Sequence, residues 1–201
     1  MNTRELALTG VYSALVVVVA YAKGLATSSL PGVFELMTVL IFVAGYCFGR
    51  WVGVSVGSLS LAIYMLIPYP FAHPAAWLYT ISPILLVVMM LLGVMFGFAG
   101  WFSTKIIKLD SPRFSLMLAT LGFVLTFIYD IMSSIGFAIA YPAFSDIWSA
   151  IYLTFIPLYY PWPPIIHTFT NTIIFWILGT PLIRTIKKLP ETLNTTRTYL
   201  F

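Results

Sequence analysis

Long apolar runs separated by short breaks are the feature of this chain that most constrains its fold. In a helix, about 20 apolar residues cross the hydrocarbon core of a bilayer, and a helix satisfies its own backbone polar groups there. The pattern therefore predicts an all-α integral membrane protein, a bundle of six transmembrane helices that forms one domain over residues 1–201. The expected spans are residues 6–23, 35–48, 51–68, 79–102, 116–141 and 160–183.

The composition agrees with this class of protein. Of the 201 residues, 61% are hydrophobic and 8% are charged, whereas about a quarter of the residues of a soluble domain are charged. The single cysteine, Cys47, excludes a disulfide framework within the chain and a cysteine-based metal cluster. The net charge of +4 does not indicate nucleic-acid binding, because the basic residues lie beside the apolar runs.

The lysines and arginines predict the orientation of the bundle. Six spans put both termini on one side, and if that side is cytoplasmic, only Lys23 lies outside. Because cytoplasmic loops carry an excess of Lys and Arg, we expect a multi-pass protein of the cell membrane with cytoplasmic N- and C-termini. The cytoplasmic positions then hold Arg4, Arg50, Lys105, Lys108, Arg113, Arg184, Lys187, Lys188 and Arg197.

The predicted outer loops are nearly uncharged and rich in aromatic residues and proline. They read PYPFAHPAAWLY at 68–79 and PLYYPWPP at 157–164. An aromatic belt at the membrane interface is one interpretation, and a rigid aromatic lid over an outward-facing pocket is the other. Residues 142–159 include an apolar stretch too short to span a membrane, which favours an interfacial or partly re-entrant helix.

Polar side chains inside the last two runs are the main candidate functional residues. Asp130 is followed by Ser133 and Ser134, and His167 and Asn171 share a helix face because they are four residues apart. Since ionisable groups within a membrane face the bundle interior, we expect Asp130, His167 and Asn171 to meet between two adjacent antiparallel helices. Two roles remain open: contact with a ligand or ion, and hydrogen bonding between helices, for example from Asp130 to Asn171.

The second and third runs carry one acidic residue and a series of glycines. Glu35 begins the second run near the outer surface, and Lys23 lies across the preceding loop and could pair with it. Gly49, Gly53 and Gly57 are spaced four apart. We expect these glycines to serve close helix packing inside the bundle.

Enzyme motifs are missing from the sequence. It contains no phosphate-binding G-x-x-x-x-G-K-[ST] loop, no H-E-x-x-H and no G-x-S-x-G. Two histidines, one in a loop and one in a span, give no metal set with plausible spacing. We therefore expect a protein that is not an enzyme and that holds no cofactor or metal.

Four stretches, in order, carry a resemblance to a known family. RELALTGVYSALVVVVAY has small residues four apart, and PGVFELMTVLIFVAGYCFGRWVGVSVGSLSLAIY has a Glu-led span, a Gly-rich turn and a span with glycines four apart. TFIYDIMSSIGFAIAY holds an Asp, and IIHTFTNTIIFWILGTPLIR holds His-x-x-x-Asn. Together they resemble the substrate-binding S component of energy-coupling factor (ECF) transporters of the vitamin-uptake type, over nearly the whole chain.

The resemblance implies a binding subunit that captures a vitamin or related small organic nutrient from outside. A membrane coupling subunit and two ABC-type ATPase subunits would then drive transport. Gly10 and Ala14 match the first-helix positions with which the family docks on the coupling subunit, with glycine in place of the first alanine. The pocket is expected between residues 24–35, residues 68–79 and the outer halves of the last two spans. The expected substrate-binding residues are Glu35, Tyr64, Trp77, Asp130, Ser134, Trp162, His167 and Asn171.

Other functions remain open, and so does the substrate. A stand-alone proton-coupled transporter would use Asp130 as its proton carrier, but such transporters usually contain internal repeats, and residues 1–100 and 101–201 show no convincing one. An Asp–His pair could also perform acid–base chemistry in a membrane enzyme. Few charges and many aromatic residues favour a flat or bulky, largely neutral molecule. Corrinoid, queuosine-precursor, thiamine-related and riboflavin-like ligands all remain open.

Overall fold

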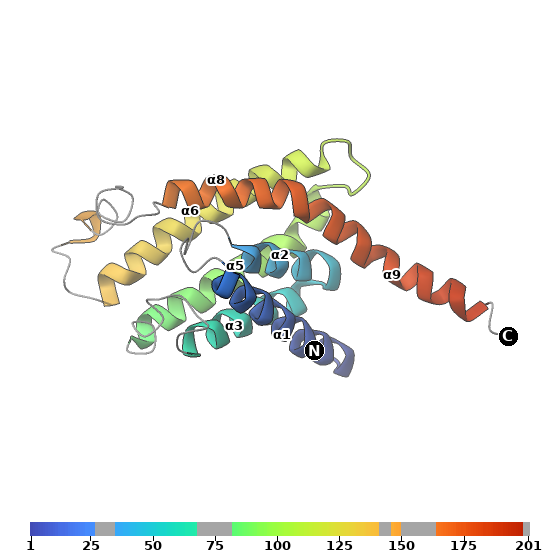
Figure 1. Ribbon diagram of the computed structural model, residues 1–201, viewed down its shortest axis with the longest axis horizontal. Helices are drawn as coiled ribbons and strands as arrows, with labels where there is room; N and C mark the ends of the chain where they lie inside the picture. The colour runs from blue at the N-terminus through green and yellow to red at the C-terminus, as the bar shows by residue number, and fades with distance from the viewer. Residues whose placement is uncertain (27–34, 68–81, 141–145, 150–163, 199–201) are drawn as a thin grey trace.

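The structure, a computed structural model, describes residues 1–26, 35–67, 82–140, 146–149 and 164–198. Within these ranges it is all-helical, and Figure 1 shows the helices packed side by side along the long axis of the molecule. The elements are α1 (Thr3–Ala26), α2 (Leu36–Phe48), α3 (Arg50–Leu66), α5 (Pro83–Ile106), α6 (Phe114–Ala140), α8 (Pro164–Ile174), the π-helix η1 (Phe175–Gly179) and α9 (Thr180–Thr198).

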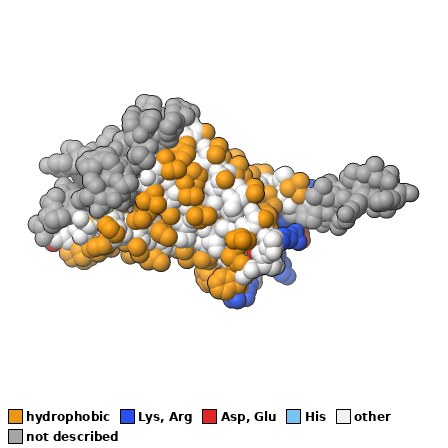
Figure 2. Space-filling view, turned by 90° about the horizontal axis from the view of Figure 1, so that it is seen from below, with side chains coloured by type: hydrophobic (Ala, Val, Ile, Leu, Met, Phe, Trp, Pro, Cys, Tyr) orange, Lys and Arg blue, Asp and Glu red, His pale blue; other side chains and the backbone are white. Residues whose placement is uncertain are grey.

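Each predicted span coincides with a described helical segment, although the lengths differ. Of the described helices, four are long and apolar enough to cross a membrane: Thr3–Ala22, Pro83–Ile106, Phe114–Ala140 and Ile165–Leu189. The second and third predicted spans are shorter apolar helices, α2 with 13 residues and α3 with 17. Hydrophobic side chains form a broad belt on the surface in Figure 2. The apolar helices indicate a membrane-embedded protein.

Several predictions fall on parts of the chain that the structure does not describe. The aromatic loop at 68–79 lies outside the described residues, as does nearly all of the loop at 157–164. Of the segment 142–159, predicted as an interfacial helix, only residues 146–149 are described. These predictions therefore stay predictions.

Local sequence explains where two of the long helices begin. At the start of α1, the Glu5 N–H donates to Asn2 Oδ1, and the Asn2 N–H donates to Glu5 Oε2. This reciprocal arrangement is a capping box, which satisfies N–H groups that a helix start leaves unpaired. At the start of α5, Ser82 accepts the Leu85 N–H, and Pro83 fits the first helical position because it has no N–H.

Closely packed glycines join α3 to α5. A Cβ added to Gly57 would overlap the Gly93 carbonyl, and a Cβ added to Gly93 would overlap the Gly57 carbonyl. Gly53 and Gly97 face each other in the same way. On α2, a Cβ at Gly45 would also overlap the Gly97 carbonyl. The backbones of these helices therefore touch, as small residues four apart permit. The expected packing role is confirmed for Gly53 and Gly57.

Gly49 differs from the other two glycines of its series. A Cβ at Gly49 would meet nothing within 4 Å, so close packing is the wrong explanation for this residue. It has φ +96, the one positive φ among the described residues. Gly49 therefore serves the tight turn between α2 and α3, because only glycine adopts this conformation readily.

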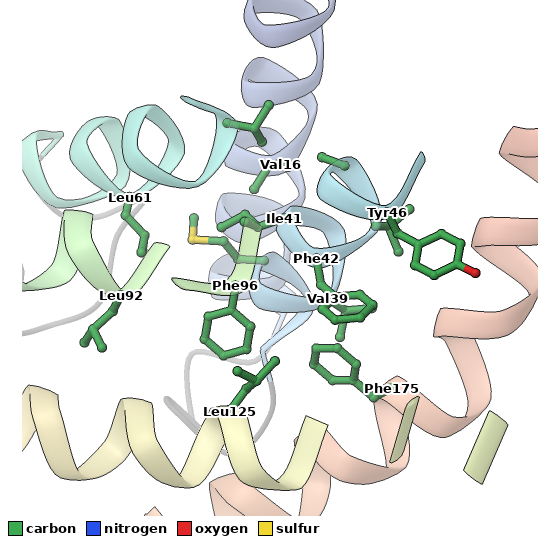
Figure 3. Packing of buried hydrophobic residues seen from close by; sticks show 14 of the residues in the cluster. Val16, Val39, Ile41, Phe42, Tyr46, Leu61, Leu92, Phe96, Leu125 and Phe175 are labelled. Atoms are coloured by element: carbon green, nitrogen blue, oxygen red, sulfur yellow. The ribbon is translucent and has the colours of Figure 1, made fainter. Parts of the chain in front are cut away.

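Aromatic rings fill the centre of the bundle, where α2, α5, α6 and η1 meet. The Phe175 ring lies edge-on to Phe42 at 5.3 Å and is stacked on Phe96 at 6.3 Å, centroid to centroid. Figure 3 shows these rings converging, with Leu125 of α6 beside Phe96. The three phenylalanines have no exposed surface. This core fixes the position of α6 and of the last helical run relative to α2 and α5.

The last helical run, residues 164–198, contains a different type of helix in its middle. The five residues Phe175–Gly179 form a π-helix between α8 and α9. Pro181 follows closely, and because proline has no N–H it cannot donate to the carbonyl four residues earlier. An inserted π turn is a frequent way to accommodate such a break. Figure 1 shows α8 alongside α6, while α9 leaves the bundle at an angle.

The glycine contact between α3 and α5 generates the first prediction. Gly93→Leu should lower the stability of the detergent-purified protein by about 1–3 kcal/mol, because a large side chain must push the two backbones apart. Gly10→Leu is the matched control, since Gly10 is exposed and a Cβ there meets nothing within 4 Å. Thermal unfolding measures both variants, and equal melting temperatures would contradict the proposed role of the contact.

Candidate functional site

A cluster of buried polar side chains lies where the start of α2, the second half of α6 and the start of α8 meet. It contains Glu35, Asp130, His167 and Asn171, all predicted as site residues. Asn171 is fully buried, and Asp130 and His167 are 6% and 8% exposed. Because α6 and α8 lie side by side (Figure 1), residues distant in sequence come within hydrogen-bonding distance. The prediction that Asp130, His167 and Asn171 meet between these two helices is confirmed.

Asp130 binds α8 through both of its carboxyl oxygens. His167 Nδ1 lies 2.8 Å from Asp130 Oδ1, and the Thr168 hydroxyl donates to Asp130 Oδ2 at 2.8 Å. Ser133 and Ser134 donate to the main-chain carbonyl of Asp130, at 3.1 and 2.7 Å. Ser134 therefore supports the helix around Asp130, while the carboxyl group is held by α8.

His167 lies between two carboxyl groups. Its Nδ1 faces Asp130, and its Nε2 lies 3.6 Å from Glu35 Oε2. Glu35 is 16% exposed, so it forms the less buried side of this group. With the imidazole protonated and both carboxyl groups ionised, the three side chains would together carry one negative charge. The sequence suggested Lys23 as the partner of Glu35; the side chain of Lys23 lies outside the described residues, and the described partner of Glu35 is His167.

Asn171 joins three helices. Its side-chain N–H₂ donates to the hydroxyls of Thr38 on α2, at 3.1 Å, and Thr126 on α6, at 3.3 Å. Its carbonyl oxygen accepts the main-chain N–H of Glu35 at 3.0 Å. Glu35 occupies the position directly before α2, at the helix start, where N–H groups lack partners within the helix. Asn171 therefore anchors the start of α2 to α6 and α8.

The hydrogen bonds of this cluster differ in detail from those the sequence suggested. The described side-chain bonds of Asp130 run to His167 and Thr168, and those of Asn171 run to α2 and Thr126. The suggested direct bond between Asp130 and Asn171 is not among these described bonds. Thr38 and Thr126 were missed. A signal for Thr126 exists, because it precedes Asp130 by four residues and so shares its helix face.

Aromatic side chains support the imidazole from the core side. The Tyr129 ring lies edge-on to His167 at 6.1 Å, and Phe96 lies edge-on to Tyr129 at 6.0 Å. Phe96 in turn stacks on Phe175. The polar cluster is thus attached to the rigid aromatic core, which fixes the orientation of His167 and limits the positions it can take.

The remaining predicted site residues lie elsewhere or outside the described chain. Tyr64, on α3, stacks on Tyr21 of α1 with centroids 5.5 Å apart. Trp77 and Trp162 lie outside the described residues. Gly10 and Ala14 are on the exposed side of α1, away from the buried face of that helix.

The chemistry available to the cluster is hydrogen bonding and charge pairing. Among the described residues, no group of three or more His, Cys, Asp or Glu side chains is placed to hold a metal ion. Both nitrogens of His167 already face carboxyl groups. The cluster offers carboxylate acceptors at its Glu35 side and a tightly bonded interior at Asp130 and Asn171.

The bonds of Asn171 generate the second prediction. Asn171→Leu should reduce stability by about 1–3 kcal/mol, because the Glu35 N–H and two buried hydroxyls lose their partner. Thr172→Val is the control, since the Thr172 hydroxyl donates within its own helix, to the Thr168 carbonyl. Thermal unfolding in detergent compares the two, and a smaller loss for Asn171→Leu than for Thr172→Val would show that the three-helix junction contributes little.

Comparison of the chain with family models, with curated proteins and with solved structures finds no match. The resemblance to ECF S components therefore rests on the sequence stretches quoted above. Support for a function comes from the geometry of the polar cluster, from the arrangement of the helices and from those stretches.

Proposed function

We propose that this protein is the membrane-embedded substrate-binding subunit of an ATP-driven importer of the ECF type. It captures a vitamin or related small organic nutrient from outside and delivers it through a shared coupling subunit and two ABC-type ATPase subunits. The observation that carries the proposal is the buried polar cluster formed by Glu35, Asp130, His167 and Asn171. The chain itself is not an enzyme in this proposal.

The composition of the cluster suits ligand binding. Small-molecule sites are mostly apolar, with a few fixed polar groups that set the orientation of the ligand. Here Asp130 and Asn171 are held by hydrogen bonds to other helices, and Glu35 is partly exposed at the start of α2. A ligand that reaches Glu35 meets a carboxylate whose neighbours are already positioned, so little ordering is needed on binding.

We further propose that α2 and α3 also cross the membrane, giving six spans with both termini in the cytoplasm. The start of α1 and the whole of α9 lie at the same end of the molecule (Figure 1). The α2–α3 turn, the end of α5 and the α5–α6 connection lie at that end too (Figure 1), and these segments carry Arg50, Lys105, Lys108 and Arg113. This grouping of basic residues supports a cytoplasmic assignment for that end. The polar cluster, near the start of α2 and of α8, then lies toward the outside.

The outer side of α1 is the proposed docking surface for the coupling subunit. Gly10 and Ala14 are exposed there, on the same side of α1 as Val11, which is 73% exposed, and Val18, which is 61% exposed. Small residues four apart allow another helix to approach closely. The buried face of α1, with Val16 at its centre, is used for packing inside the bundle.

A proton-coupled transporter is the second candidate, and one observation favours it. Glu35, His167 and Asp130 form a continuous series of groups that can exchange protons, with contacts of 3.6 and 2.8 Å. Proton relays in membrane transporters are built from Asp, Glu and His in such chains. In this alternative the protein acts without ATPase partners, and Asp130 releases and takes up a proton during each transport cycle.

The third prediction concerns the bound nutrient. Asp130→Asn should reduce the amount of small molecule released on denaturing protein purified from its native host, by about tenfold or more, because hydrogen bonds to a charged group contribute about 1.5–3 kcal/mol. Mass spectrometry of the released molecules measures the effect. Asp110→Asn is the control, since Asp110 is exposed in the α5–α6 connection. If Asp130→Asn retains the wild-type amount, the carboxyl group serves structure alone.

The fourth prediction concerns the partners. Affinity purification in mild detergent from the native host should recover a multispanning coupling subunit and two ABC-type ATPases, identified by mass spectrometry. Gly10→Leu combined with Ala14→Leu should remove these partners and leave the released nutrient unchanged, because leucine side chains prevent close helix approach. Thr120→Leu is the control, an exposed position on α6. A wild-type chain that purifies alone, under conditions that preserve other membrane complexes, would favour the proton-coupled alternative.

A further inference from the structure

Two cationic side chains from different helices lie over one aromatic ring at the end of α5. Lys105 Nζ is 4.6 Å from the centroid of the Trp101 ring, and the guanidinium carbon of Arg50 is 5.9 Å from the same centroid. Arg50 also lies 4.8 Å from the ring centroid of Trp51. Cations are attracted to the faces of aromatic rings at such distances. The two positive charges are thereby gathered at one place.

The backbone holds this group of residues in place. Arg50 is the first residue of α3, directly after the tight turn at Gly49. About one turn further along α3, Gly53 is in backbone contact with Gly97 of α5, and Trp101 follows Gly97 by four residues on the same helix face. The positions of Arg50 and Trp101 relative to each other therefore follow from the glycine packing between α3 and α5.

The two cations lack an acidic partner within the described part of the chain. The ion pairs described there are Met1–Glu5 and the two pairs of His167, and none includes Arg50 or Lys105. Both side chains are exposed. Two like charges that share one ring repel each other, so an anion between them would lower the energy of the arrangement.

Exposed apolar side chains continue from this cation pair along α5. Phe98 and Phe102 are each 47% exposed, and the Phe98 ring lies 5.2 Å from that of Trp101 and 6.2 Å from that of Phe102. Lys105 is in the last turn of α5. In Figure 2, Lys and Arg side chains gather beside one end of the hydrophobic belt. The cations therefore border an apolar surface of the kind that faces lipid.

We propose that Arg50 and Lys105, positioned by Trp101, bind the phosphate headgroup of an anionic phospholipid. Its acyl chains lie along Phe98 and Phe102. A headgroup with a phosphate and a net negative charge matches the two cations, while the tails match the aromatic strip, so one amphiphilic molecule satisfies both features. This site is separate from the polar cluster at the start of α2 and does not depend on the proposed nutrient uptake.

The experiment measures lipid binding to the full-length protein in detergent by native mass spectrometry, with phosphatidylglycerol and phosphatidylcholine as probes. The wild-type chain should bind phosphatidylglycerol more tightly than phosphatidylcholine. Arg50→Gln combined with Lys105→Gln should weaken phosphatidylglycerol binding about thirtyfold, and Lys105→Gln alone about fivefold. Phosphatidylcholine binding should stay unchanged, since its headgroup carries no net charge.

A control with the same change in net charge distinguishes a defined site from general surface charge. Arg113→Gln combined with Arg184→Gln removes two exposed positive charges and should leave phosphatidylglycerol binding within about twofold of wild type, because neither residue belongs to the cation pair over Trp101. An equal loss in both double variants would overturn the proposal. Displacement of phosphatidylglycerol by equimolar soluble glycerol phosphate would also overturn it, because the site would then recognise the phosphate without the tails.

Discussion

A buried amide or carboxyl group in an apolar bundle requires hydrogen-bond partners, and this requirement determines how α2, α6 and α8 fit together. An unpaired amide or carboxyl group in such surroundings costs several kcal/mol, so each such residue requires a bond from another helix. Asn171 meets the requirement with bonds to Thr38, Thr126 and the Glu35 main chain, and Asp130 does so with His167 and Thr168. Helix position and site geometry thus follow from the same hydrogen bonds.

The other half of the bundle is held differently. Between α3 and α5, and between α2 and α5, glycine backbones touch. Such contacts tolerate almost no change in distance. A nutrient-binding protein of the proposed kind needs a fixed frame on one side, and on the other a polar junction whose groups are already positioned for a ligand.

The sequence predicts the helices and the central site residues well, because both depend on local spacing. Apolar runs determine the helices, and the four-residue spacing of His167 and Asn171 puts them on one face toward Asp130. The partner of Glu35 was not predictable in this way, because His167 is far away in the sequence and no periodic signal connects the two. The different role of Gly49 also needed the backbone angle, since spacing alone groups it with Gly53 and Gly57.

The π-helix has a consequence for which side chains can share the bundle interior. Buried residues occur at every fourth position through the last helical run: His167, Asn171, Phe175, Gly179 and Ile183. In an uninterrupted α-helix, each step of four residues turns the side chain by about 40° beyond a full circle, so the series would rotate by roughly 160°. One additional residue in the π turn takes back about 100° of this rotation. The η1 segment therefore keeps the buried side chains of α8 and those at the start of α9 on one side of the helical run. This inward-facing side begins at the polar cluster and ends at Ile183.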